Sequence, residues 1–270
     1  MELPKELPKE AVVKKLMLLF VSLLLAGCAS VPRPVSTAAV ESAGPPPYDA
    51  WARVLTKHVD ARGRVNFSGV AKDRADLDRF VAYVYDVGPA THPQRFPTPD
   101  HVMAFHLNAY NALALHNVLE AGIPSTLDGL AKVNFFYLRK VQVGGVPISL
   151  YDYENKVIRA LGEPRIHVAL NCMVVGCPRL PRERFVAEQL NAQLEREATY
   201  FFNEERNVQI DVARQKLRLS AILQFYTADF LASAPSLTAY VNRYRTLKLP
   251  ETYAVDFIDY DWTINAQPRQ

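Results

Sequence analysis

The segment that most constrains the fold is one long helix predicted between Thr98 and Gly122. Thr98 is a good N-cap, Pro99 suits the first helical position, and Asp100 adds negative charge to the first turn. Gly122 suits the position where a helix ends in a left-handed turn. Such a helix is apolar nearly all round, so we expect it to be buried at the centre of the domain. Its large apolar side chains are Phe105, Leu107, Leu113, Leu115, Val118 and Leu119.

The segments around this helix predict helices and strands that do not alternate strictly. Residues 141–149 predict a hairpin around a Gly-Gly pair, and Ser149 caps a further helix that ends at Gly162. Residues 165–171 alternate between apolar and other side chains and predict a strand. We therefore expect an α+β fold in which the central helix packs on a mostly antiparallel sheet. Further helices are predicted at 48–59, 73–86, 182–205, 221–231 and 237–244, and further strands at 208–211, 217–219 and 257–264.

The N-terminal region has the parts of a secretory signal in their usual order. Two lysines precede an apolar run at residues 16–26, which is too short for a membrane span because a span needs about 20 residues. The run leads into the sequence LAGC, which resembles the bacterial lipobox, where the cysteine is acylated and becomes the first residue of the mature protein. The alternative is a buried helix that happens to contain Cys28. We expect a lipoprotein signal peptide at 1–27. Residues 1–12 fit a signal poorly, so we also expect that translation begins at Val13 and that the signal itself starts there.

The residues that follow predict a tether between a lipid and a folded domain. Residues 29–47 contain five prolines and no apolar period, so residues 28–47 are expected to form a Pro-rich tether. A single domain is then expected over residues 48–270. No Asp follows Cys28, which favours attachment to the outer membrane, facing the periplasm. The membrane, reached through the N-terminal lipid, is therefore the first expected partner.

Three further segments together resemble the domain of unknown function 547 family, in a bacterial lipoprotein member. They are AFHLNAYNAL at 104–113, RIHVALNC leading into GCP at 165–178, and YDWTIN at 260–265. The resemblance extends over residues 48–265, with His106 standing where the family usually has Trp. It implies a fold and a set of residues but no established reaction. A weaker similarity links the chain to papain- and transglutaminase-like folds, yet the predicted central helix has no cysteine.

Two cysteines form a C-x4-C pattern at Cys172 and Cys177. In an oxidising periplasm they could form a disulfide that stabilises the fold by about 2 kcal/mol. They could instead be free thiols, either buried or reactive, or ligate a metal together with His167. The metal alternative is weak because no second Cys or His pair stands at ligand spacing, so no metal and no cofactor are expected.

His167 is the best candidate for acid–base chemistry, because imidazole titrates near neutrality. Glu154 is its expected acidic neighbour, with Arg159 and Arg165 competing for the same carboxylate. On an extended strand His167 and Cys172 would lie about 16 Å apart, too far for a nucleophile and its base. The candidate catalytic residues are therefore His167, Glu154 and Cys172, without a dyad fixed by spacing.

Asparagines on the central helix suggest a polar cluster in the core. Asn108 and Asn111 stand three residues apart on one helix face, and buried amides need hydrogen-bond partners. They could simply hold neighbouring loops in place. They could also line a pocket with Asn171. We expect Glu154 and His167 to converge with Asn108 or Asn111 beneath the sheet face that carries His167.

Two classes of function follow from these residues. The first is a binding or scaffold module of the cell envelope, whose ligand is an envelope protein or a peptidoglycan-like molecule. The second is a thiol- or His-dependent hydrolase or transferase acting on peptide or amide bonds. Thiol redox chemistry is less favoured, because C-x4-C is not the C-x-x-C spacing. The net charge of +3, without a concentrated basic stripe, argues against a nucleic-acid partner.

Overall fold

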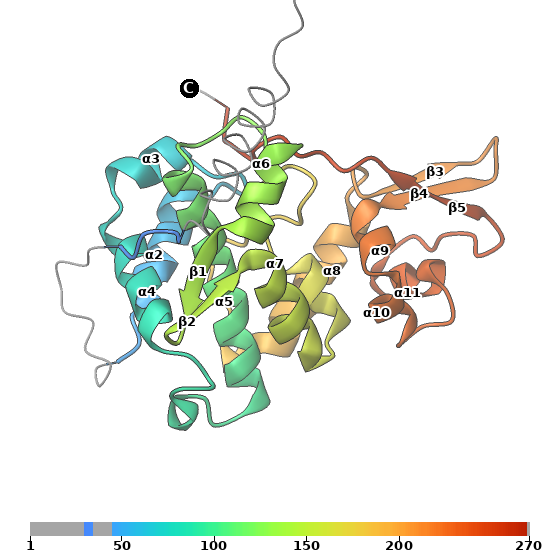
Figure 1. The fold of residues 1–270 in the computed structure, drawn as a ribbon. Coiled ribbons are helices and arrows are strands. Elements are labelled where there is room, and N and C mark those ends of the chain that lie inside the picture. Colours follow the sequence, from blue (N-terminus) through green and yellow to red (C-terminus); the bar gives the residue numbers. More distant parts are fainter. Residues whose placement is uncertain (1–29, 35–44, 269–270) are drawn as a thin grey trace, which may run out of the picture.

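The computed structural model describes residues 30–34 and 45–268 (Figure 1). The predicted signal peptide, Cys28 and most of the predicted tether lie outside these residues. Within the described ranges, no helix combines the length and the apolar character that crossing a bilayer requires.

The predicted central helix is confirmed as α5 (Pro99–Glu120), the longest helix among the described residues. The Thr98 hydroxyl accepts a hydrogen bond from the backbone N–H of His101 at 3.4 Å, and Gly122 adopts a left-handed turn with φ of 77°. Every residue from 103 to 119 is buried. The prediction that this helix packs on a sheet is wrong, because its main neighbours are α4 (Ala75–Asp86), η3 (Tyr153–Ile158) and η6 (Ala187–Gln189).

A large first hydrophobic core surrounds α5. The predicted hairpin lies at its edge as β1 (Lys140–Val143) and β2 (Val146–Ser149), which pair antiparallel with Val141 opposite Ile148. Ser149 caps the next helix as predicted, and the helical segment ends at a left-handed Gly162. The other elements of this region are α2 (Tyr48–His58), α3 (Phe67–Lys72), η1 (Pro93–Arg95), α6 (Leu130–Val133), η2 (Asn134–Leu138), α7 (Leu150–Asp152) and η4 (Arg159–Leu161).

A smaller second core is built by the C-terminal part of the chain (Figure 1, orange to red). Its sheet has the order β3-β4-β5, antiparallel between the first two strands and parallel between the last two. The helix expected at 182–205 is shorter, the one at 221–231 is broken at Tyr226, and the late strand begins and ends earlier than expected. The elements are α8 (Leu190–Asn203), β3 (Val208–Asp211), β4 (Lys216–Ser220), α9 (Ala221–Phe225), α10 (Thr227–Leu231), α11 (Leu237–Tyr244) and β5 (Ala254–Ile258). The α+β class is confirmed, with both small sheets at the periphery.

The strand predicted at 165–171 is wrong. Residues Pro164–Val168 form the 3-10 helix η5, which begins where the Glu163 carboxylate accepts a hydrogen bond from the N–H of Arg165 at 2.9 Å. Ile166 packs in the first core and Val168 in the second. The apolar alternation therefore comes from a segment wedged between two cores, not from the two faces of a strand. The 16 Å estimate for His167 and Cys172, which assumed an extended chain, no longer applies.

Residues 30–34, which the sequence assigns to the tether, lie against the domain. Ser30 pairs with Lys140 of β1, and the N–H of Val31 donates to the Lys140 carbonyl at 2.7 Å. The Tyr85 hydroxyl donates to the Val31 carbonyl at 3.1 Å, and the Val31 side chain is 3% exposed. This short stretch is part of the folded structure rather than a free linker.

Candidate functional site

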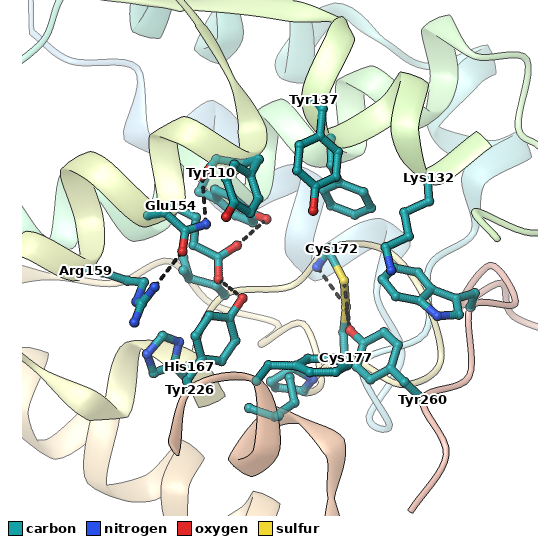
Figure 2. Close-up of a pocket in the computed structure, with 18 residues that line it drawn as sticks. Tyr110, Lys132, Tyr137, Glu154, Arg159, His167, Cys172, Cys177, Tyr226 and Tyr260 are labelled. Atoms are coloured by element: carbon teal, nitrogen blue, oxygen red, sulfur yellow. Dashed lines mark hydrogen bonds between the residues drawn. A yellow bond between two sulfur atoms is a disulfide. The ribbon is translucent and has the colours of Figure 1, made fainter. Parts of the chain in front are cut away.

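A cavity of about 350 Å³ lies where the two cores meet (Figure 2). Tyr110 and Glu154 reach it from the first core, and Ile222 and Tyr226 reach it from the second. The ionisable nitrogen-bearing side chains in its wall are Lys132, Arg159 and His167. The wall is mostly aromatic, with Tyr110, Phe136, Tyr137, Tyr151, Phe225, Tyr226, Tyr260 and Trp262.

Among the described residues, Glu154 is the one carboxylate in the cavity wall. It lies on η3, a π-helical turn, and its two oxygens accept hydrogen bonds from different tyrosines: Oε2 from the Tyr110 hydroxyl at 3.0 Å and Oε1 from the Tyr226 hydroxyl. Burial raises the pKa of Glu154, and the two tyrosine hydrogen bonds and Arg159 oppose that rise. The carboxyl group therefore binds a proton more readily than an exposed Glu does.

The predicted pairing of His167 with Glu154 is wrong. The Nε2 of His167 lies 2.7 Å from Oδ2 of Asp229 on α10, and Arg159 donates to both oxygens of Asp229 at 2.8 Å. Of the two arginines expected near Glu154, Arg159 binds Asp229 and Arg165 binds Glu163 at 2.7 Å. Asp229 could not be recognised from the sequence, because it lies 62 residues after His167 in a helix without a distinctive motif.

His167 is neutral and held by its carboxylate partner. Burial lowers the pKa of His167 to about 4, although Asp229 acts in the opposite direction. Arg159 is the main reason that the pKa of Asp229 is lowered to about 2, with His167 contributing further. A neutral imidazole next to an ionised Asp229 donates its Nε2 proton to that carboxylate. The Nδ1 atom of His167 is buried without a hydrogen-bond partner among the described residues.

Tyr226 connects Glu154 with His167 even though the two do not touch. Its ring stacks on the His167 imidazole, with centroids 3.8 Å apart and planes 12° apart, while its hydroxyl binds Glu154. The break between α9 and α10 falls at this residue, which takes φ of −121° and ψ of 29°. Tyr226 could not be recognised from the sequence, because the helical pattern of residues 221–231 is continuous and does not mark the point where the helix breaks.

The asparagines form a supporting network behind the cavity rather than part of its wall. The side-chain oxygen of Asn111 accepts from the N–H of Asn171 at 2.7 Å, and its amide group donates to the Ala169 carbonyl at 3.1 Å. The Asn171 amide group donates to the Pro178 carbonyl at 2.5 Å. Asn108 turns elsewhere, toward Trp51 and Phe185. The predicted cluster of Glu154, His167 and these amides is therefore not formed.

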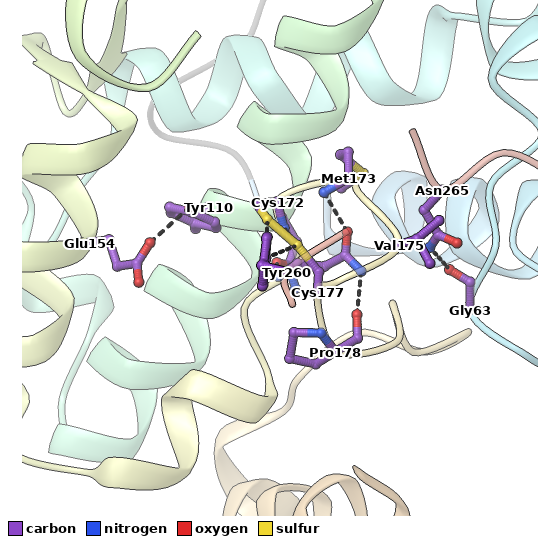
Figure 3. The surroundings of a disulfide bond; sticks show 12 residues. Gly63, Tyr110, Glu154, Cys172, Met173, Val175, Cys177, Pro178, Tyr260 and Asn265 are labelled. Carbon is purple, nitrogen blue, oxygen red and sulfur yellow. Dashed lines mark hydrogen bonds between the residues drawn. A yellow bond between two sulfur atoms is a disulfide. The ribbon is translucent and has the colours of Figure 1, made fainter. Parts of the chain in front are cut away.

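Cys172 and Cys177 form a disulfide, the first of the three alternatives drawn from their spacing (Figure 3). Both sulfur atoms lie close to the Tyr260 hydroxyl, at 3.1 Å and 3.2 Å, and both residues line the cavity. In this state Cys172 has no free thiol that could act as a nucleophile. Among the described residues, no group of three His, Cys, Asp or Glu side chains could hold a metal ion.

Comparison with known proteins gives one family match. Residues 94–202 match the family described as "Protein of unknown function, DUF547", whereas no curated protein and no solved structure matches the chain. The match contains α5, η3, η5 and the disulfide, but it ends before Tyr226, Asp229 and Tyr260. It is shorter than the 48–265 range over which the sequence resembles the family. Over residues 94–202, the chain is therefore similar to the DUF547 family.

Proposed function

We propose that this chain is a lipid-anchored protein of the bacterial cell envelope that binds a peptidoglycan-like glycan in the cavity between its two cores. The observation that carries the proposal is the composition of the cavity wall. Eight aromatic side chains surround a single carboxyl group, Glu154. Binding sites for small molecules are typically apolar and aromatic, with a few polar groups that fix the orientation of the ligand.

Several aromatic rings at the cavity are more exposed than rings in a core. Tyr137 and Tyr151 are each 42% exposed and stack on one another with centroids 4.5 Å apart, and Phe225 is 50% exposed. Exposed apolar patches of this kind mark binding surfaces. An amino-sugar ring suits them, because its C–H faces are apolar while its hydroxyl and amide groups stand at the edge. The ring can cover an aromatic face without losing the hydration of its polar groups.

Glu154 supplies the polar contact that such a ring requires. A carboxylate offers about four lone-pair positions, and the two tyrosine hydroxyls use two of them. The remaining positions can accept hydrogen bonds from sugar hydroxyls. Because both tyrosines already hold the carboxyl group in place, little side-chain entropy is lost when a ligand binds.

The cell-envelope location is supported by sequence and by chemistry. The LAGC sequence ending at Cys28 fits a lipid anchor, and attachment to the outer membrane facing the periplasm would place the domain in an oxidising compartment. The Cys172–Cys177 disulfide suits such a compartment, because disulfides persist where thiols are not kept reduced. A peptidoglycan-like ligand would be within reach of a protein anchored there.

The test is a titration of the full chain with soluble disaccharide–peptide fragments of peptidoglycan, followed by calorimetry. We expect saturable binding that weakens about tenfold in Glu154→Gln, because hydrogen bonds to a charged group contribute about 1.5–3 kcal/mol. Tyr226→Phe should weaken binding less, since it removes one of the two hydroxyls that position Glu154.

A matched control is Glu188→Gln, whose side chain is 69% exposed and stands outside the cavity. It should bind the fragments as the unmodified chain does. Equal affinity of the Glu154→Gln and Glu188→Gln variants would contradict the proposed role of Glu154. Absence of binding to every glycan fragment would overturn the proposed ligand class.

The second candidate function is a thiol- or His-dependent hydrolase or transferase acting on peptide or amide bonds. One observation favours it: the Asp229–His167 pair has the form in which a carboxylate orients a general base. The thiol version requires Cys172 to be reduced. Incubation of the fragments with the chain, before and after reduction, would reveal this activity as newly released amines. Product in the unmodified chain and none in His167→Gln would favour this alternative.

A further inference from the structure

The helical segment formed by α6 (Leu130–Val133) and η2 (Asn134–Leu138) exposes an apolar face to solvent. Leu130 is 88% exposed, Leu138 49% and Val133 43%. Asn134 is the single polar side chain among the exposed positions of this segment. Surface helices of globular proteins normally carry charged or polar residues on the side that faces water, so this pattern is unusual.

The opposite side of the same segment already makes its contacts with the protein. Phe135 and Phe136 are buried in the first core, and Lys132, Phe136 and Tyr137 line the cavity. The exposed leucines and valine are therefore not needed to complete the core. An apolar surface with no contact of its own is expected to serve an interaction.

The charges around this face suit an anionic surface. Residues 129–140 contain three basic side chains and no acidic one. Lys132 lies over the Trp262 ring and Arg139 donates to Asn117, which leaves Lys140 to flank the face. Basic residues that flank an apolar helical face are typical of helices that lie in the headgroup region of a bilayer. A Lys or Arg near an anionic membrane surface is attracted to it and strengthens binding.

Residues 30–34 lie next to this face and follow closely after Cys28, the residue predicted to carry the lipid. Ser30 pairs with Lys140, which stands two residues after Leu138 at the end of η2. Cys28 precedes Ser30 by two residues, and a residue spans at most about 3.6 Å, so its backbone lies within about 7 Å of that of Ser30. An acyl chain on Cys28 would thus enter the bilayer beside the basic end of the apolar face.

We propose that the exposed face of α6–η2, comprising Leu130, Val133 and Leu138, docks on the lipid bilayer to which Cys28 is anchored. This inference rests on the proposed lipid anchor. It goes beyond that anchor because it assigns a protein surface to the membrane. The face lies at the depth of the headgroups and the first methylene groups, with Lys140 near the lipid phosphates.

The experiment uses the acylated full chain in vesicles of phosphatidylethanolamine and phosphatidylglycerol that also contain nitroxide-labelled lipid. One fluorophore is attached at Leu130→Cys. The matched control carries it at Val212→Cys, a residue 69% exposed in the turn between β3 and β4. Mass spectrometry establishes acylation and the intact Cys172–Cys177 disulfide in each preparation. We expect at least half of the fluorescence at position 130 to be quenched and little change at position 212.

The outcomes separate this inference from the anchor on which it rests. Acylated protein with equal, weak quenching at both positions overturns the docking face and leaves the anchor standing. Protein without an acyl group on Cys28 overturns both. A label at position 130 that is already shielded from water without vesicles shows that another part of the chain covers the face, which also overturns docking. In acylated protein carrying Leu130→Glu and Val133→Glu, quenching of a label at Leu138→Cys should fall several-fold.

Discussion

The two cores of the molecule differ in where their polar side chains find partners. In the first core, buried asparagines on α5 bind backbone groups nearby, as Asn111 does with Ala169 and Asn117 with Phe135. Asn207 likewise binds the backbone carbonyl of Phe201 in the second core, but two other side chains of this core reach across to the first: Tyr226 to Glu154 and Asp229 to His167. Polar groups that a core cannot satisfy by itself meet at the junction. The candidate site is therefore a property of the contact between cores rather than of either core.

The family match follows the same division. Residues 94–202 contain most of the first core's contribution to the cavity, including Tyr110, Glu154 and the disulfide. Tyr226 and Asp229, which the second core supplies, stand after the matched region. A comparison based on the matched residues alone would therefore leave out one of the two tyrosines that bind Glu154 and the carboxylate that binds His167.

The largest expected effects come from removing one fully buried leucine from each core. Leu113→Ala in α5 and Leu219→Ala in β4 should each lower the free energy of unfolding by about 2–5 kcal/mol, more at Leu113 because α5 is enclosed on all sides. We expect both variants to unfold in one transition, since η5 and α8 join the cores. Hydrogen-exchange mass spectrometry in urea measures this. Protection lost in β3 and β4 well before α5 would show that the cores are independent.

A smaller effect is expected from breaking the polar link between the cores. Asp229→Asn leaves Arg159 without its carboxylate and removes the ionic partner of His167, so the free energy of unfolding should fall by about 2–3 kcal/mol. Urea unfolding followed by circular dichroism gives the value. Asp256→Asn, on an exposed position of β5, serves as the control and should change stability by less than about 0.5 kcal/mol. Similar losses in both variants would mean that the link contributes nothing specific.

The smallest expected effect is the dependence of this link on pH. The pKa of His167 is lowered to about 4 by burial, against about 6.5 in an unfolded chain. The unfolded state thus binds the proton first, and the stability held by neutral His167 is present above pH 6.5 and is lost as the pH falls toward 4. The loss should be on the order of 2 kcal/mol and absent in His167→Gln. His101→Gln, a partly exposed histidine, should retain it. An unchanged pH profile in His167→Gln would show that His167 does not titrate as proposed.

The sequence predicted the parts of the fold that depend on neighbouring residues. The Thr98 cap, the Gly122 stop, the Gly-Gly hairpin and the end at Gly162 are local signals, and each is present in the structure. The prediction of a strand at residues 165–171 failed because Ile166 and Val168 pack in different cores. In a short stretch of sequence, this arrangement gives the same apolar alternation as a strand. Asp229 stands 62 residues after its partner His167, and Tyr226 stands 72 residues after its partner Glu154, so only the folded structure pairs them.

The pairing of Ser30 with Lys140 would limit how far a domain anchored through Cys28 can move from the membrane. A flexible linker of 20 residues would have a root-mean-square end-to-end distance of about 25 Å, and the domain could move that far from its attachment point. Because Ser30 and Val31 are held against β1, a lipid on Cys28 would be separated from the folded structure by at most about 7 Å of chain. Anchored through Cys28, the domain would reach ligands whose distance from the bilayer is no greater than the thickness of the domain. It would not reach ligands deeper in the periplasm. Val31→Pro removes the N–H that donates to the Lys140 carbonyl. The chain between Cys28 and the domain would then be longer, and the domain would reach ligands further from the bilayer.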